Sequence, residues 1–313
     1  VWVAFHTWLQ RGSTLKGVYY LNSARSCLYQ LLKSTKPEIV YFPRFVCSSF
    51  LSYARELDIE FEFYSIDINF LPIVSAASVA NSNSLIVYVN YFGMCTAQVD
   101  YVIDKFESQR VVIDNSQSYN FTKENALATI YSPRKFFPLS DGGILFSDVK
   151  VEVPNEFGPI NLNYFEEKTR GHHEKAYNGF KASEDELANM GPLALNEYSL
   201  RLLKTFLSEK HLLSIRESFY KDLDDKFGKI NLINGSFSKL YRIFPLCYPL
   251  QTSTPISVSK LVDKMVFAPV YWPDLADNEL NEFEKSLVKK TVFLPLSNIR
   301  NRNDFEYLIQ TVS

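Results

Sequence analysis

Apolar runs and amphipathic segments alternate along the first half of the chain. The run at residues 84–89 (SLIVYV) is apolar at nearly every position, as in a parallel strand that is buried on both faces. Residues 20–32 have the pattern of a turn that opens a helix, with Ser23 as its N-cap. The same patterns predict further strands at residues 39–42, 60–66, 111–113, 128–131 and 143–146, and further helices at residues 45–57 and 98–108.

Short strands that alternate with helices predict an α/β fold with a mostly parallel sheet. In such sheets, ligands bind beyond the carboxyl ends of the strands. Asp114 directly follows the strand at residues 111–113, and the turn at residues 22–25 precedes a helix. Both are therefore at favoured places for a ligand site.

The pattern changes after about Val151. Residues 158–191 are polar, and we expect them to be irregular. Residues 196–227 predict a long helix with a break near Lys210. A long helix at this point is well placed to lead from one part of the protein to the next.

The C-terminal part has the pattern of a smaller α+β unit. Short strands are followed by a helix near residues 258–265 and by a terminal helix near residues 303–311. We therefore expect a large domain over residues 1–210 and a small C-terminal domain over residues 211–313.

Composition narrows the class of protein. The chain of 313 residues is 46% hydrophobic and has a formal net charge of −2, which does not favour nucleic-acid binding. No apolar run approaches the roughly 18 residues of a membrane helix, and residues 1–12 lack the features of a signal peptide. The four cysteines form no CxxC pair. We expect a cytosolic protein without a metal site or disulfide bonds.

Four segments carry side chains that suit chemistry. Each alone is ordinary, because a turn before a helix, an Asp after a strand and a Lys before two glycines usually serve structure. The sequence has no GxGxxG, GxSxG or HExxH motif. The four segments are NSAR at residues 22–25, VNYFG at residues 89–93, IDNSQ at residues 113–117 and KFFPLSDGG at residues 135–143.

In this order, the segments resemble the DegT/DnrJ/EryC1/StrS family of pyridoxal-phosphate (PLP) sugar aminotransferases. The family has a small-residue turn before an early helix, as at residues 22–25, and a strand that ends in an aromatic–Gly pair, as at residues 92–93. It has a D-x-[AS]-[QH] segment, as at residues 114–117, and a lysine followed six residues later by an acid and two glycines, as at residues 135–143. The FLPL sequence at residues 293–296 is also similar, so the resemblance spans nearly the whole chain.

The resemblance implies a fold-type I PLP-dependent transferase and a role for several residues. Lys135 would hold PLP through a Schiff base, for which the amine must be uncharged. Asp114 would face the pyridine nitrogen, and Gln117 would lie over the ring. The neighbouring Phe136 and Phe137 are expected to bury Lys135, which would lower the pKa of its amine.

The phosphate of PLP needs N–H donors, and a helix N-terminus supplies them. Ser23, Ala24 and Arg25 open the first predicted helix, so the resemblance implies that the phosphate binds there. The Arg25 side chain would add a positive charge.

The sequence departs from the family pattern in three places. Cys47, four residues after Pro43, stands where the family often has an aromatic residue stacked on the cofactor. Ile130 replaces a serine five residues before the lysine, and Ser132 is the candidate to take its place. The Asn-aromatic-Arg segment that reaches the neighbouring subunit's phosphate in the family is not found.

We therefore expect an aminotransferase that moves an amino group from an amino acid, with glutamate as the expected donor, to a nucleotide-linked keto sugar. The resemblance also implies a homodimer with sites at the subunit interface, small-molecule substrates and no nucleic-acid or membrane partner. Residues 158–191 and Tyr271–Trp272 are candidates to line the acceptor cleft. Two alternatives stay open: a PLP-dependent sugar dehydratase of the same fold, and a non-catalytic relative that serves as a binding or assembly subunit.

Overall fold

The computed structural model describes residues 17–80, 83–208, 211–237, 243–296 and 302–312. Its main sheet is built from the strands β1 (Val18–Leu21), β2 (Ile39–Pro43), β3 (Glu60–Ile66), β4 (Pro72–Ile73), β5 (Ser84–Val89), β6 (Val111–Asp114), β7 (Ala128–Tyr131) and β8 (Gly143–Ser147). These strands are arranged in the order β1-β8-β7-β6-β5-β2-β3-β4. The strands predicted at residues 39–42, 60–66, 84–89, 111–113, 128–131 and 143–146 are all present, with their ends within one residue.

The middle of this sheet is parallel. Each neighbouring pair in the block β3-β2-β5-β6-β7 is parallel, whereas β8 runs antiparallel to both β7 and β1. Asp114 at the end of β6 pairs in register with Ile130 of β7. The residues that follow β6 and β7 therefore leave the sheet at the same edge.

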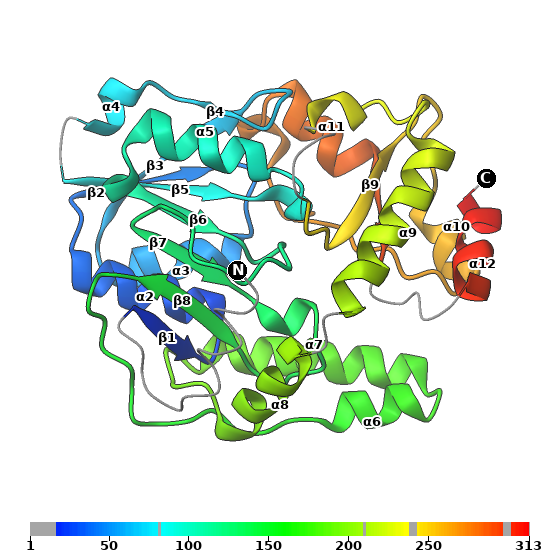
Figure 1. The fold of residues 1–313 in the computed structure, drawn as a ribbon, viewed down its shortest axis with the longest axis horizontal. Coiled ribbons are helices and arrows are strands. Elements are labelled where there is room, and N and C mark those ends of the chain that lie inside the picture. Colours follow the sequence, from blue (N-terminus) through cyan, green and yellow to red (C-terminus); the bar gives the residue numbers. More distant parts are fainter. Residues whose placement is uncertain (1–16, 81–82, 209–210, 238–242, 297–301, 313) are drawn as a thin grey trace.

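Helices cover both faces of the sheet (Figure 1). Helix α2 (Ala24–Thr35) packs against α3 (Ser48–Glu56) and against β7 and β8, while α5 (Thr96–Phe106) packs against β5 and β6. A five-residue helix, α4 (Ala76–Ala80), precedes β5. The predicted N-cap of α2 is confirmed, because Ser23 Oγ accepts a hydrogen bond of 3.1 Å from the Ser26 N–H.

The prediction that residues 158–191 are irregular is wrong. They contain α6 (Asn163–Thr169) and α7 (His173–Asn189), which pack against each other as a hairpin. The Tyr164 ring of α6 meets the Phe180 ring of α7 edge-on at 5.7 Å. The helical pattern is weak in the sequence because α7 buries only three side chains, Ala176, Ser183 and Leu187.

The long helix predicted over residues 196–227 is present as two helices. They are α8 (Glu197–Ser208) and α9 (His211–Phe227). The predicted break near Lys210 falls at residues 209–210, which lie outside the described residues.

The C-terminal part is built on an antiparallel pair of strands. β9 (Cys247–Gln251) pairs with β10 (Thr291–Pro295), and the helices around them are α10 (Val258–Asp263), α11 (Glu282–Lys290) and α12 (Arg302–Val312). Figure 1 shows these elements gathered to one side of the main sheet. None of the helices in the described ranges has the length and apolar character needed to cross a bilayer.

Two hydrogen bonds join the C-terminal part to the end of β5. The Phe244 N–H donates to the Gly93 carbonyl at 2.8 Å, and the Leu246 N–H donates to the Phe92 carbonyl at 2.9 Å. One continuous cluster of buried apolar side chains includes residues from both parts, from Leu21 to Leu308. The carboxyl end of the parallel strands is therefore covered by the segment that leads into β9.

Candidate active site

Asp114 is a buried carboxyl at the carboxyl end of β6. Its side chain is 7% exposed, and Oδ1 accepts a hydrogen bond of 2.8 Å from the Ser116 N–H. Burial raises the pKa of this carboxyl, and the positive charge of Lys135 acts in the opposite direction. The fold thus brings together an acid and a base that are 21 positions apart in the sequence.

Lys135 follows β7 at the end of a single helical turn, Pro133–Lys135. Its N–H donates to the Ser132 carbonyl at 3.2 Å. The expectation that aromatic neighbours bury Lys135 is wrong, because its side chain is exposed. Phe137 instead points into the protein, where its ring stacks on Phe206 at 4.9 Å, and Phe136 packs on Tyr119.

The two ends of the Gln117 amide have different surroundings in the described structure. The Gln117 side chain is 2% exposed, and Oε1 accepts a hydrogen bond of 2.7 Å from the Phe92 N–H. Nε2 is buried and has no hydrogen-bond partner within the described part of the chain. A buried amide donor without a partner is unfavourable, so this nitrogen is suited to a ligand acceptor.

The N-terminus of α2 is held against the loop before β8. The Gly142 N–H donates to the Asn22 carbonyl at 2.7 Å, and Gly143 lies directly against the peptide between Ser23 and Ala24. Burial raises the pKa of the Cys27 thiol on the first turns of α2, and the charge of Asp114 acts in the same direction. The start of α2 therefore lies near the carboxyl end of β6.

Three further predicted residues are less closely linked to Asp114. Ser132 is buried directly after β7, and its carbonyl accepts the Lys135 N–H. Arg25 is half-buried beside Tyr53, where burial raises the pKa of the phenol and the Arg25 charge opposes this shift. Cys47 is partly exposed at the start of α3, with its Sγ 2.9 Å from Ser49 Oγ.

The aromatic pair at residues 271–272 packs inside the C-terminal part and against the main domain. The Tyr271 ring meets Phe293 edge-on at 4.6 Å, and the Trp272 ring meets Phe45 edge-on at 4.5 Å. Phe45 in turn stacks on Tyr91, just after β5, at 5.6 Å. These rings close one side of the region beyond the strand ends.

Arg216 of α9 is a buried cation that the sequence pattern does not reveal. Its side chain is 8% exposed, and its guanidinium lies over the rings of Phe136 and Tyr119. Burial lowers the pKa of Arg216 to about 10. Because arginines on amphipathic helices usually face water, a single Arg in the pattern of α9 carries no signal of this burial.

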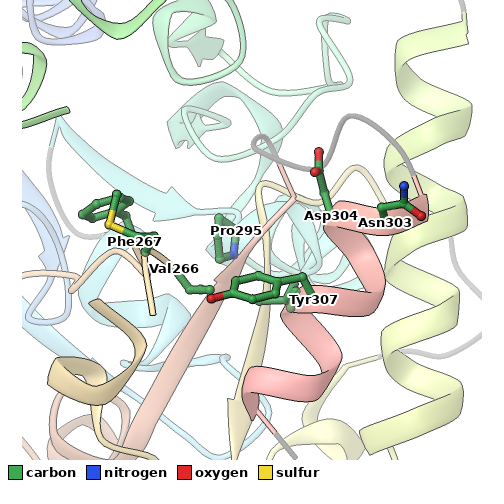
Figure 2. Close-up of a pocket in the computed structure, with 8 residues that line it drawn as sticks. Val266, Phe267, Pro295, Asn303, Asp304 and Tyr307 are labelled. Atoms are coloured by element: carbon green, nitrogen blue, oxygen red, sulfur yellow. The ribbon is translucent and has the colours of Figure 1, made fainter. Parts of the chain in front are cut away.

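Figure 2 shows a separate pocket in the C-terminal part. Asn303 and Asp304 lie on one side of it, Val266 and Phe267 on the other, and the Tyr307 ring between them. The remaining lining residues are Met265, Pro295 and Leu308. None of the residues around Asp114 and Lys135 lines this pocket, so it is distinct from the candidate active site.

A doubly covered, mostly parallel sheet with polar groups beyond its strand ends defines an α/β protein with a ligand site at that edge. Solved structures of sugar aminotransferases share this architecture. A DegT/DnrJ/EryC1/StrS aminotransferase from Brucella abortus superposes with a TM-score of 0.65 at 12% identity, over 99% of this chain and 88% of that one.

Two other solved structures agree over a similar length. The aminotransferase PseC of Helicobacter pylori, involved in the biosynthesis of pseudoaminic acid, gives a TM-score of 0.63 at 14% identity, with 99% of this chain and 90% of that chain covered. The same values hold for Spr1654 of Streptococcus pneumoniae, a proposed sugar aminotransferase, in its PMP form. At these identities the likeness establishes the fold, and the predicted fold is confirmed.

No family model matches the sequence, and no curated protein matches it either.

Proposed function

We propose that the protein is a PLP-dependent aminotransferase that transfers an amino group from an amino acid to a nucleotide-linked keto sugar. The observation that carries this proposal is that buried Asp114 ends β6 and Lys135 follows the neighbouring β7, where the Lys135 charge opposes the rise in the Asp114 pKa that burial causes. The shared fold of sugar aminotransferases supports it. Glutamate is the amino donor that we expect first.

The residues at this edge fit the chemistry of PLP. A protonated pyridine nitrogen needs an anion, and Asp114 offers a buried carboxylate whose desolvation a cation would offset. Gln117 offers the buried Nε2 donor, for which the residues that the structure describes supply no hydrogen-bond acceptor. Lys135 offers an exposed amine within electrostatic reach of Asp114.

We assign the phosphate end of PLP to the start of α2. Ser23 caps this helix, and Ala24 and Arg25 form its first turn, where N–H groups and the helix dipole favour an anion. Ser132, which directly follows β7, would face the same region. Cys47 would take the place of a stacking residue without supplying a ring.

The chain itself would supply acid–base catalysis. When bound, PLP withdraws electrons from the carbon that bears the amino group. Lys135 Nζ would take a proton from that carbon and return it on the other side of the amino nitrogen, which is a 1,3-proton shift. Asp114 would stay ionised and stabilise the positive charge of the pyridine nitrogen. Gln117, which is held in place because its Oε1 accepts the Phe92 N–H, would orient the ring.

Two measurements test the proposal together. The purified protein should absorb in the visible range as PLP proteins do, and glutamate should remove this absorbance and release 2-oxoglutarate. Borohydride reduction followed by peptide mapping should place the pyridoxyl group on Lys135 rather than on Lys123 or Lys150. Visible absorbance that no amino donor changes would favour the dehydratase, and a protein that never binds PLP would favour the non-catalytic relative.

We also propose that the protein works as a homodimer. Large apolar side chains are exposed on and before the α6–α7 hairpin, among them Phe157 at 56%, Ile160 at 55% and Tyr177 at 60%. Covering them with a second copy would bury apolar surface, and an obligate interface exceeds about 2,000 Å² in total. Light scattering at micromolar concentration should give twice the 36.1 kDa chain mass, and a monomer would contradict the proposal.

A further inference from the structure

Arg216 is a buried charge without an acidic partner in the part of the chain that the structure describes. Its Nη1 is buried and has no hydrogen-bond partner among the described residues. The groups that affect its pKa besides burial are Tyr119 and Cys247, neither of which is a carboxylate. An unpaired buried charge is costly, so proteins usually pair it or use it to bind a ligand.

The faces and the edge of this guanidinium have different surroundings. The guanidinium carbon lies 5.2 Å from the centre of the Phe136 ring and 5.7 Å from the centre of the Tyr119 ring. Aromatic rings stabilise a cation at its face but supply no hydrogen-bond acceptor. The Nη1 donor therefore needs an acceptor that the described residues do not provide.

Both rings belong to the loops that carry the candidate active site. Phe136 directly follows Lys135, and Tyr119 comes two residues after Gln117. The loops that follow β6 and β7 thus carry the assigned cofactor residues and also enclose Arg216. This connection makes Arg216 part of the same region of the molecule.

We propose that Arg216 binds the carboxylate of the amino donor, in a niche formed by Phe136 and Tyr119. The assignment rests on the proposed aminotransferase function. One guanidinium matches one carboxylate in charge, and its planar edge can bind both carboxylate oxygens. A diphosphate carries more negative charge and would need further cations, whereas the two neighbours of Arg216 here are uncharged rings.

Arg216 would then determine which amines react. An amino acid would be held by its carboxylate while its amino group reaches the cofactor, whereas an amine without a carboxylate would lack this anchor. Losing a hydrogen-bonded charge pair of this kind lowers affinity by about 10- to 100-fold. Loss of Arg216 should therefore raise the KM for an amino acid donor. It should not raise the KM for an amine that has no carboxylate.

The test compares Arg216→Met with Lys221→Met, which removes an exposed charge from the same helix. Glutarate, a dicarboxylate that cannot donate an amine, should bind the wild-type protein and the Lys221 variant in calorimetry, and bind Arg216→Met at least about tenfold more weakly. The stability of Arg216→Met should equal or exceed that of the wild type, because an unpaired buried charge is removed.

Arg216→Lys serves as a second variant if Arg216→Met does not fold. It keeps the charge but lacks the planar edge, so glutarate should bind it more weakly than wild type. Equal glutarate affinity in the wild type and these variants would overturn the proposal. Inorganic phosphate that binds more tightly than glutarate, in a manner that depends on Arg216, would overturn it in favour of a phosphate-bearing substrate.

Glutarate binding is measured on protein with and without added PLP, which separates the two proposals. Binding that depends on Arg216 in a protein that never transaminates would support the anion site and contradict the proposed function. Transamination of glutamate with an unchanged KM in Arg216→Met would support the function and contradict the role of Arg216.

Discussion

Gly143 lies so close to the carbonyl of Ser23 that no side chain fits between them. A Cβ added to residue 143 would be 2.2 Å from the Ser23 oxygen and 2.7 Å from the Ala24 nitrogen. Both are backbone atoms, which a change of rotamer cannot move. The second glycine of the DGG sequence thus allows the first residue of β8 to pack against the N-terminus of α2.

Gly143→Ala should destabilise the protein by at least about 3 kcal/mol, because either β8 or α2 must move. Urea denaturation followed by circular dichroism measures the change. Gly235→Ala is the matched control, since a Cβ at residue 235 would meet nothing within 4 Å. Similar stabilities for the two variants would show that the close approach is not tight in solution.

Asp114→Asn should raise the free energy of unfolding at neutral pH while it abolishes turnover. Burial raises the pKa of Asp114 from 3.8, so the folded state binds its proton more tightly than the unfolded chain does. Its contribution to stability therefore falls as the pH rises above 3.8 through the folded value. Asn can still accept the Ser116 N–H but carries no charge to desolvate.

The two Asp114 proteins should thus have similar stability in acid and diverge toward neutral pH. Denaturation curves across this range provide the measurement. A variant that is less stable than wild type at neutral pH would mean that Asp114 already has a strong cationic partner. Normal turnover in folded Asp114→Asn would contradict its assignment to the pyridine nitrogen.

Gln117→Leu should cost about 1–3 kcal/mol, because the Phe92 N–H loses its acceptor in a dry environment. Phe92 adopts a φ of 59°, a strained conformation that this hydrogen bond helps to hold. Gln109→Leu, at an exposed site, should change stability by less than about 0.5 kcal/mol. Thermal and urea unfolding measure both variants. Equal losses of stability in Gln117→Leu and Gln109→Leu would contradict the structural role of Gln117.

Asn281→Ala should destabilise by about 1–2 kcal/mol. Asn281 and Glu284 form a reciprocal capping box on α11, and the same pair binds both backbone groups of Ile66 at the end of β3. Ser257→Ala removes a longer cap of 3.5 Å on exposed α10 and should cost less than half as much. The order of the two urea midpoints checks this, and a reversed order would contradict it.

The sheet was predictable because its strands are nearly continuous apolar runs between turn residues, as at Ser84–Val89. The hairpin of α6 and α7 was not predictable, because α7 buries only Ala176, Ser183 and Leu187. Gly179 allows Tyr164 to approach, since a Cβ there would lie 3.0 Å from the Tyr164 side chain. So few buried side chains leave no wide apolar stripe to detect in the sequence.

Within the candidate site, the strand pattern predicted that Asp114 lies at the ligand edge of the sheet, and the resemblance to the aminotransferase family implied that Lys135 lies near it. The surroundings of Lys135 were not predictable in this way. Apolar neighbours in sequence do not bury a side chain when they turn inward, as Phe137 does. Arg216 could not be found either, because its environment is supplied by aromatic residues 80 or more positions away.

The turn before α2 is completed by residues that are synthesised much later. Asn22 bonds to the backbone of Gly191 and Leu193, and the Leu195 N–H donates to the Tyr20 carbonyl. On the ribosome, this turn must therefore wait for about 170 further residues before its partners exist. Contacts of such long range slow folding. The phosphate end assigned to α2 would thus be completed only after the residues near Gly191 and Leu193 have been synthesised.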